Sequence, residues 1–295
     1  MRLTKRLRWR CENRVLQASE DKGKQSEHLV RKIRVLTRQI SATYGVRRPS
    51  FFEMANNAGQ LNIVFTSRYF QPGGHAFNET YLFVGSSIIG RPGTPAFPYE
   101  ALDRERPLIY ISLGTLFNAR QDFYQCCFAA FAGSRYQVVL SVGRKTPIAS
   151  PGSVPANFIV REYVPQLDIL QRAALFISHE GMNSVNEALY YEVPLVVIPQ
   201  SADQPWVARR VARLGAGKII RRAHVSASRL RSVAEEVLTH ATYTQRSKQI
   251  GETLREAGGP ERAADAIQQF LQSAVRYVPP VPNSWVEAFL NRISY

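Results

Sequence analysis

The chain has 295 residues, of which 45% are hydrophobic and 21% charged, and its formal net charge is +15. This composition is typical of a globular protein with enough apolar residues for a packed core, in one large domain or two modest ones. No segment approaches the roughly 20 apolar residues of a membrane span, and the basic N-terminus lacks the apolar stretch of a signal peptide. We therefore expect a cytoplasmic protein that has no membrane partner.

The positive charge is concentrated near the N-terminus. Residues 1–48 contain 14 Lys and Arg against four Asp and Glu, a net charge of +10 that leaves +5 for the rest of the chain. Such a segment can bind nucleic acid, but no binding motif with interleaved aromatic residues supports that interpretation. We expect residues 1–28 to be a basic leader that is solvated or poorly ordered, and we expect no nucleic-acid partner.

The first half of the chain contains a few short elements. Apolar residues recur at helical spacing in the first of them and predict an amphipathic helix, at Leu29, Ile33, Leu36 and Ile40. This helix should end before Gly45. Residues 61–66 and 81–84 have the composition of short strands, separated by a Pro-Gly-Gly turn. His75 lies in that turn without a partner motif, so we expect a surface residue.

Beyond this point the pattern alternates between strands and helices. Residues 88–100 include three Pro and two Gly and resemble a linker. Apolar strand-like runs then follow one another, at residues 108–113, 136–142, 158–164, 175–178, 194–198 and 216–220. Helical patterns lie between several of these runs and dominate the chain after Ser226. Such alternation predicts an α/β fold with a doubly wound parallel sheet. The adjacent Cys126 and Cys127 fall on a predicted helix and cannot usefully pair, which leaves Cys11 alone.

Polar residues follow two of the predicted strands at the point where each strand ends. Asp203 and Gln204 follow the strand at 194–198, and a larger group follows the strand at 175–178, consisting of His179, Gly181, Asn183 and Ser184. Because the carboxyl ends of parallel strands meet at one edge of a sheet, these groups should share one crevice. The helix that begins there brings an N-terminus that favours an anion, and Glu187 should lie on the same side of that helix as Asn183.

The stretch from Tyr163 to Gln204 resembles the donor-binding segment of the UDP-glycosyltransferases, in particular the bacterial macrolide and flavonoid type. It contains, in order, Tyr-x-Pro-Gln, Ser-His-x-Gly-x-Asn-Ser followed by Glu187, Val-Pro and Asp-Gln. The resemblance implies the GT-B fold, in which two Rossmann-like domains face a cleft. It extends over residues 29–272, so most of the acceptor-binding domain is missing, and we expect an N-terminally truncated member of the family.

The resemblance also implies a domain organisation. Residues 29–87 would be the remnant of the N-terminal acceptor-binding domain, and residues 88–105 the linker. Residues 106–272 would form the C-terminal donor-binding domain, and residues 273–295 a C-terminal tail. In the family, helices near the C-terminus reach back to the other domain.

By the same resemblance, Tyr163 would stack on the uracil of a UDP-sugar, and Gln166 would hydrogen-bond toward the base or ribose. Glu187 would accept hydrogen bonds from the ribose hydroxyls. The alternative for Tyr163 is the last residue of a buried strand, and the alternative for Glu187 is a solvated helix residue.

The remaining donor contacts concern the phosphates and the sugar. The diphosphate would bind to the group formed by His179, Gly181, Asn183 and Ser184. Asp203 and Gln204 would grip hydroxyls of the sugar and favour glucose. A second phosphate contact would come from the loop of Ser112, Gly114 and Thr115, although Ser-Leu-Gly-Thr also reads as a tight turn.

The reaction of the family is an inverting transfer that needs a base for the acceptor hydroxyl. That base is a His near the start of the N-terminal domain, and none of the five histidines of this chain lies in the matching context. The sequence therefore identifies no catalytic residue. Leaving-group stabilisation would be electrostatic, so we expect neither a metal nor another cofactor.

Two residues depart from the family pattern. Glu180 replaces a small residue beside the diphosphate, and Glu192 replaces a Gly after the helix, where a left-handed backbone would cost about 1 kcal/mol. The leading hypothesis is an impaired glycosyltransferase that moves a hexose, with glucose as the expected sugar, to a hydroxyl of a small lipophilic acceptor. The alternative is a non-catalytic UDP-sugar-binding half that needs a separate acceptor-domain partner.

Overall fold

The computed structural model divides the chain into two compact units, residues 1–60 and residues 61–295. It describes the following residues: 20–45, 59–90, 96–115, 118, 120–144, 146, 154–179, 181–200 and 204–274. Most of the predicted leader and tail, together with Cys11, Glu180 and Asp203, lies outside the described residues. The domain boundaries predicted at residues 88 and 106 stay predictions.

The described part of the first unit is one helix, α2, which spans Glu20–Tyr44 and ends before Gly45 as its sequence predicts. Two residues of its apolar stripe, Leu36 and Ile40, are about half exposed. Thr37 is buried and its hydroxyl donates to the carbonyl of Ile33 at 2.9 Å. A hydroxyl that bonds back into its own helix leaves no polar group of Thr37 unsatisfied.

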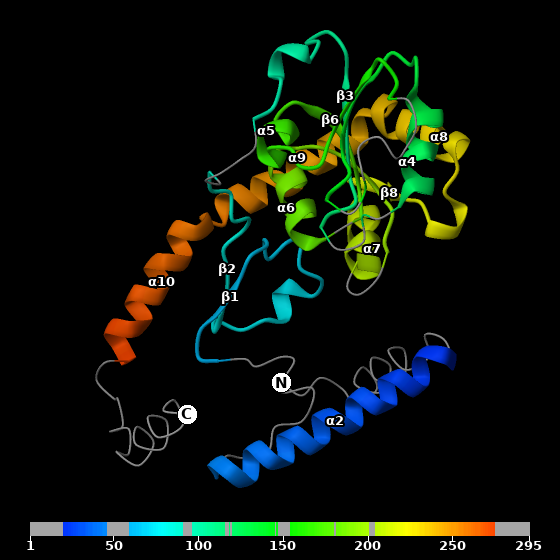
Figure 1. Ribbon diagram of the computed structural model, residues 1–295. Helices are drawn as coiled ribbons and strands as arrows, with labels where there is room; N and C mark the ends of the chain where they lie inside the picture. Colours follow the sequence, from blue (N-terminus) through cyan, green and yellow to red (C-terminus); the bar gives the residue numbers. More distant parts are fainter. Residues whose placement is uncertain are drawn as a thin grey trace. The chain divides into compact units, whose positions relative to one another are not determined.

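The second unit is built on a six-stranded parallel sheet (Figure 1). Its strands are β3 (Leu108–Ser112), β4 (Gln137–Ser141), β5 (Phe158–Arg161), β6 (Ala173–Ser178), β7 (Leu195–Val197) and β8 (Gly217–Ile219). They lie in the order β5-β4-β3-β6-β7-β8, and all five pairings are parallel. The predicted α/β fold is confirmed. The chain builds outward from β3 first on one side and then on the other, so the strand order reverses between β3 and β6.

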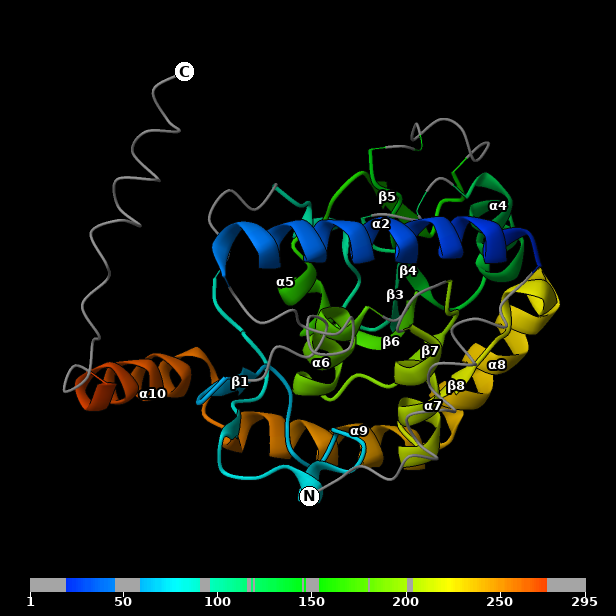
Figure 2. The same ribbon diagram turned by 90° about the horizontal axis from the view of Figure 1, so that it is seen from below.

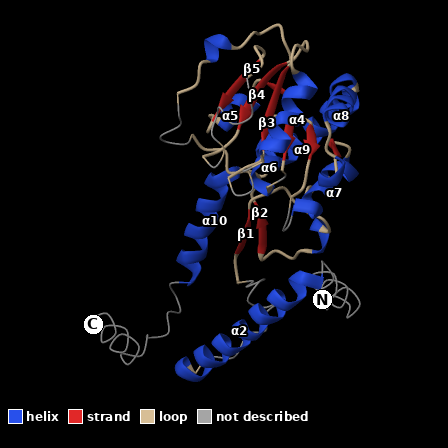
Figure 3. Cartoon of the chain, turned by 45° about the vertical axis from the view of Figure 1, so that its right-hand side comes forward, coloured by secondary structure: helices blue, strands red, loops and turns tan. Residues whose placement is uncertain are grey.

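Helices cover both faces of this sheet (Figure 3). On one face, Ile109 and Ile111 pack in a cluster with residues of α4 (Gln121–Phe131) and α8 (Ala227–Thr239). On the other, Leu108 and Tyr110 pack with the helices α5 (Gln166–Leu170), α6 (Met182–Tyr190), α7 (Gln204–Leu214) and α9 (Ala241–Glu256). Alternate residues of β3 therefore pack into the cores on opposite faces of the sheet. Helix α9 runs past α6, and α10 (Gly259–Ala274) continues from it (Figure 2). No described helix is long and apolar enough to cross a membrane.

Residues 61–90 form a small parallel sheet of two strands, β1 (Asn62–Val64) and β2 (Tyr81–Phe83). The connection includes a short helical turn, Gly74–Ala76, on which His75 is exposed as expected. Another short turn, Tyr99–Ala101, follows the second strand. There the Tyr99 hydroxyl donates to Asp168 at 2.6 Å, and partial burial together with this bond raises the pKa of Tyr99 to about 12.

Asn186 ties residues 61–90 to helix α6. Its side chain is 2% exposed, accepts a hydrogen bond from the Thr66 hydroxyl at 3.0 Å, and donates to the Phe65 carbonyl at 2.8 Å. The Ser86 hydroxyl donates to the Asn186 carbonyl at 3.2 Å. A buried amide with both ends satisfied specifies one relative position of its partners. The small sheet is thus attached to one side of α6.

Glu192, which follows the C-terminal end of α6, has a left-handed backbone. Glu192 has a φ of 65°, and its N–H and that of Val193 bond back to Leu189 and Ala188 at 2.9 Å each. This is a Schellman motif, in which Gly is the preferred residue. The Glu192 carboxylate pairs with Arg255 at 2.9 Å, and Arg255 also donates to the Tyr190 carbonyl. These contacts offset part of the cost of about 1 kcal/mol for the left-handed side chain.

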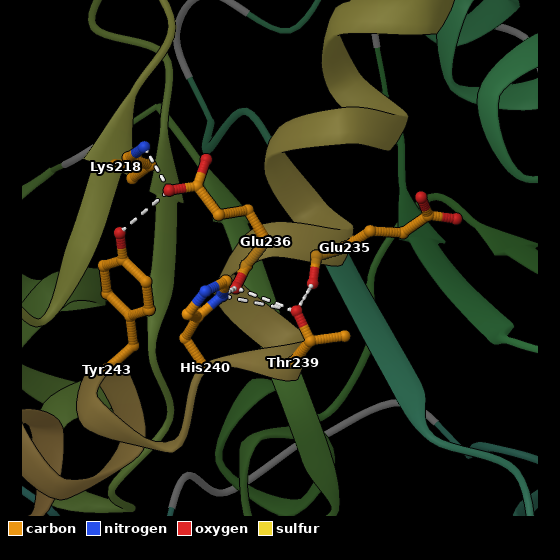
Figure 4. A network of polar contacts seen from close by, with 6 residues as sticks. All are labelled: Lys218, Glu235, Glu236, Thr239, His240 and Tyr243. Atoms are coloured by element: carbon orange, nitrogen blue, oxygen red, sulfur yellow. Dashed lines mark hydrogen bonds and ion pairs between the residues drawn. The ribbon is translucent and has the colours of Figure 1, made fainter.

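A polar network fastens the edge strand β8 to the corner between α8 and α9 (Figure 4). Lys218 on β8 pairs with the Glu236 carboxylate, to which the Tyr243 hydroxyl also donates at 3.4 Å. The imidazole of His240 bonds the carbonyl of Glu236 at 2.8 Å, so Nδ1 carries the proton there. Donation from Lys218 lowers the pKa of Glu236.

Replacement of Asn186 by Ala should lower the free energy of unfolding by about 1–3 kcal/mol, because the buried Thr66 hydroxyl and the partly buried Phe65 carbonyl lose their partner. Urea unfolding followed by circular dichroism measures this difference. The exposed Asn183, on the same helix, is the control, and Asn183→Ala should change stability by less than about 0.5 kcal/mol. Equal effects of the two substitutions would contradict the anchoring role of Asn186.

The lowered pKa of Glu236 means that the folded state favours the carboxylate. Its stabilisation should be complete above the unfolded carboxyl pKa of about 4.3 and should fade as pH falls through the lowered folded value. Glu236→Gln should therefore cost less than about 1 kcal/mol at pH 7, and the difference should shrink toward pH 3. Lys218→Met should show the same pH dependence. A difference that is constant with pH in both variants would exclude this ion pair as its source.

Candidate functional site

A pocket of about 490 Å³ opens at the carboxyl ends of the central strands. Ser112 and Ser178, the last residues of β3 and β6, are paired across the point where the strand order reverses. Ser112 lines the pocket together with Ser141, the last residue of β4. In open α/β sheets this reversal point is the usual place for a ligand, because the loops on its two sides diverge.

His179 lies between two glycines at this edge. A Cβ added to Gly114, whose φ is +72°, would lie 2.4 Å from Cε1 of the imidazole. A Cβ added to Gly181 would lie 3.0 Å from Nε2. All three residues line the pocket, as does Thr115. Because Gly114 and Gly181 have no side chain, they leave room for the imidazole of His179.

The first turn of α6 faces the same pocket. Gly181 is the N-cap and offers no side chain to bond the helix N–H groups. Met182, Asn183 and Ser184 form the first turn and line the pocket. The amides of a first turn have no partner within the helix, and the helix dipole adds partial positive charge there. This wall of the pocket therefore favours an anion.

Glu187 is 4% exposed, so it is not the solvated helix residue of the alternative interpretation. The amide Nε2 of Gln166 donates to Glu187 Oε2 at 2.5 Å and lies 3.4 Å from the Ser184 hydroxyl. The Tyr110 hydroxyl donates to Oε1 of the same amide at 2.9 Å. All four residues line the pocket. Burial of a carboxylate costs free energy unless such donors hydrogen-bond it.

Tyr163 lies two residues beyond β5, is 40% exposed, and lines the pocket. It is therefore not the last residue of a buried strand. The guanidinium of Arg144 is 5.6 Å from the centre of its ring. The ring is amphipathic and accessible, and a flat ligand can stack on such a surface.

The structure does not bring every predicted residue to the pocket. Gln204 is buried at the start of α7, and its Oε1 accepts a hydrogen bond from the Gln200 N–H at 2.7 Å. It does not line the pocket, and its neighbour Asp203 lies outside the described residues. The sugar-binding role of this pair stays a prediction.

A second hollow, of about 380 Å³, shares Asn183 and Glu187 with the first. Its other walls come from residues 65, 86–87 and 89–90 and from Asn186. Phe65 and Ile89 expose apolar surface there, at 44% and 54% of their side chains. The two hollows thus share one turn of helix α6.

The sequence analysis missed several residues that line the pocket, namely Tyr110, Ser141, Gly143, Val164 and Met182. Gly143 follows the strand predicted at 136–142, so the rule applied to the strands at 175–178 and 194–198 would have found it, whereas Ser141 lies within that predicted strand. Tyr110 lies inside an apolar run, where nothing marks a polar role. Within the described residues no three His, Cys, Asp or Glu form a group that could hold a metal ion.

A parallel sheet with helices on both faces and a pocket at its reversal point defines a Rossmann-like domain. Residues 136–269 match the family described as erythromycin biosynthesis protein CIII-like, C-terminal domain. The UDP-glucosyltransferase YojK of Bacillus subtilis is 43% identical over 243 residues, which are 81% of this chain and 60% of YojK. YdhE of the same organism is 40% identical over 237 residues, 80% of this chain and 60% of YdhE.

Solved structures of glycosyltransferases are also similar to this chain. The calicheamicin glycosyltransferase CalG4 superimposes with a TM-score of 0.70 and 28% identity, over 83% of this chain and 60% of CalG4. The glycotransferase of kitacinnamycin superimposes with a TM-score of 0.69 and 29% identity, over 85% of this chain and 67% of that protein. These matches support a member of the UDP-glycosyltransferase family, and the six-stranded parallel sheet fits the C-terminal Rossmann-like domain of its GT-B fold. The chain spans about 60% of the length of the curated relatives that it matches.

Gly114→Ala should displace His179, because the added methyl would overlap the imidazole. We expect the affinity for UDP to fall by at least about tenfold, or 1.4 kcal/mol, in calorimetric titration. Gly133→Ala is a matched control, since Gly133 has a similar φ of +63° but open space around its Cβ position. Similar losses of affinity in both variants would show that backbone strain, and not the imidazole, is responsible.

Proposed function

We propose that the pocket binds a UDP-sugar and that the complete enzyme transfers the hexose, with inversion, to a hydroxyl of a small lipophilic acceptor. The main support is one observation: the residues that the family resemblance assigns to the base, ribose and diphosphate line a single pocket. They are Tyr163, Gln166, His179, Gly181, Asn183, Ser184 and Glu187. Its volume of about 490 Å³ is in the range of small-molecule sites.

The nucleoside would lie between Tyr163 and Glu187. Stacking of a base on an aromatic ring contributes roughly 1–3 kcal/mol and needs an accessible face, which Tyr163 has. Glu187 would accept hydrogen bonds from the ribose hydroxyls, because a carboxylate only accepts. Its burial strengthens those bonds, since few water molecules compete there.

The diphosphate would bind at the first turn of α6. There Asn183, Ser184 and the amides of the turn would meet the phosphate oxygens, and the glycines around His179 permit close approach. As the bond to the sugar breaks, negative charge builds on the departing UDP. Preorganised donors stabilise such charge better than mobile water does, so His179 and the helix terminus would lower the barrier to departure.

The sugar and the acceptor are inferred from observations outside the donor pocket. Glucose is supported by the names of the relatives and by the Asp203–Gln204 pair of the sequence. An apolar acceptor is supported by Phe65 and Ile89, which line the hollow beside the donor pocket. Inversion requires attack from the face opposite UDP. The family's base does not match any histidine of this chain, so we expect this chain alone to bind the donor and to transfer little.

Isothermal titration calorimetry with UDP-glucose should show one binding site. Glu187→Gln keeps the shape of the side chain but replaces the charged acceptor, so we expect a loss of affinity of roughly 10- to 100-fold. Glu235→Gln is the control, because Glu235 lies on α8 and pairs with Arg231 away from the pocket. Absence of heat at millimolar UDP-glucose, with the protein folded, would refute the donor site. Competition with UDP-galactose tests the choice of sugar.

A further inference from the structure

Three side chains from three different elements form a chain of hydrogen bonds that ends in the pocket. Tyr110 on β3 donates to Gln166 on α5 at 2.9 Å, and Gln166 donates to Glu187 on α6 at 2.5 Å. Tyr110 has no counterpart among the residues that the sequence resemblance assigns to the donor. Tyr110 is nevertheless the buried end of this series of hydrogen bonds, with 1% of its surface exposed.

The direction of each bond in this chain is determined by chemistry. A carboxylate only accepts, so Gln166 must present its NH₂ group to Glu187. The amide oxygen then points to Tyr110, whose hydroxyl must donate. A flip of the amide would place oxygen against oxygen at Glu187. The carboxylate of Glu187 therefore selects one of two amide orientations, and the Tyr110 hydroxyl holds the Gln166 side chain in that orientation by donating to its amide oxygen.

Tyr110, the buried end of these hydrogen bonds, is held rigidly by its neighbours. The ring of Tyr110 stacks on that of Phe176 in the neighbouring strand β6, with centres 4.7 Å apart and planes 6° apart. Both residues belong to the buried cluster on the α5–α6 face of the sheet. Gln166, in contrast, is only partly buried on a helix of five residues, a short element that cannot by itself hold a side chain in place.

We propose that Tyr110 is a positioning residue that acts through Gln166 on Glu187 and thereby sets the preference for ribonucleotide over 2′-deoxyribonucleotide donors. The proposal rests on the donor site proposed above. A carboxylate oriented by Gln166 still has lone pairs for further donors, and the 2′-hydroxyl of a ribose is such a donor. If the carboxylate rotates away, the contact with the 2′-hydroxyl weakens while base stacking and phosphate binding persist.

The test compares UDP with 2′-deoxy-UDP by calorimetry in the wild type, Tyr110→Phe and Tyr136→Phe. Tyr136→Phe is the control, because Tyr136 is equally buried but precedes β4, at the opposite end of the sheet from the pocket. The wild type should prefer UDP. Tyr110→Phe should reduce that preference about three- to tenfold, the size of one net hydrogen bond, with a smaller loss of affinity for 2′-deoxy-UDP, which keeps only the 3′-hydroxyl as a donor to Glu187. Tyr136→Phe should leave the preference unchanged.

Gln166→Met provides a second route, should Tyr110→Phe fail to fold. It should reduce the preference by itself, and Tyr110→Phe added to it should have no further effect, because the two residues act in series. Equal losses for both nucleotides, or an unchanged ratio in either folded variant, would overturn the proposal. A wild type that binds neither nucleotide would instead refute the donor site itself, so the two failures are distinguishable.

Discussion

The site depends on the position of one short helix. Helix α6 has nine residues, and isolated helices of this length are not stable in water. Its first turn forms one wall of the pocket, so the contacts that hold it also determine the geometry of the site. Asn186 holds it on the side of residues 61–90, and the Tyr110–Gln166–Glu187 chain holds it on the side of the sheet. Adjacent residues, Asn186 and Glu187, thus bond to different elements of the fold.

These contacts are polar and buried, which has an energetic consequence. A buried amide or carboxylate costs free energy unless it is hydrogen-bonded, so each partner of Asn186 and Glu187 is needed for stability. The same requirement gives specificity, because only one arrangement satisfies all groups at once. At the far end of the helix, Glu192 adopts a backbone conformation that favours Gly, and its carboxylate pairs with Arg255 of α9. The middle of α6 and the residue that follows its C-terminal end are therefore tied to other elements.

Much of the fold followed from the alternation of apolar runs and helical patterns. All six strands of the parallel sheet were predicted, with ends that differ by at most a few residues. Helix α5 was not predicted, because its five residues follow a proline and are too few to show a periodicity. The parallel pairing of β1 with β2 was not predicted either, because the turn between them resembles that of a hairpin. The hydrogen bonds of a parallel pair come from distant segments and leave no local pattern.

The sequence by itself determined the fold class, the family resemblance and most of the residues that line the pocket, because these depend on local periodicity and on short ordered motifs. The tertiary structure decided which of those residues share one cavity. It buried Gln204 at the start of α7, placed His179 between Gly114 and Gly181, and connected Tyr110 to Glu187 through Gln166. Tyr110 and Glu187 are far apart in the chain, and only the pairing of β3 with β6 brings them together. Such contacts depend on three-dimensional packing, which no spacing within a single stretch of sequence encodes.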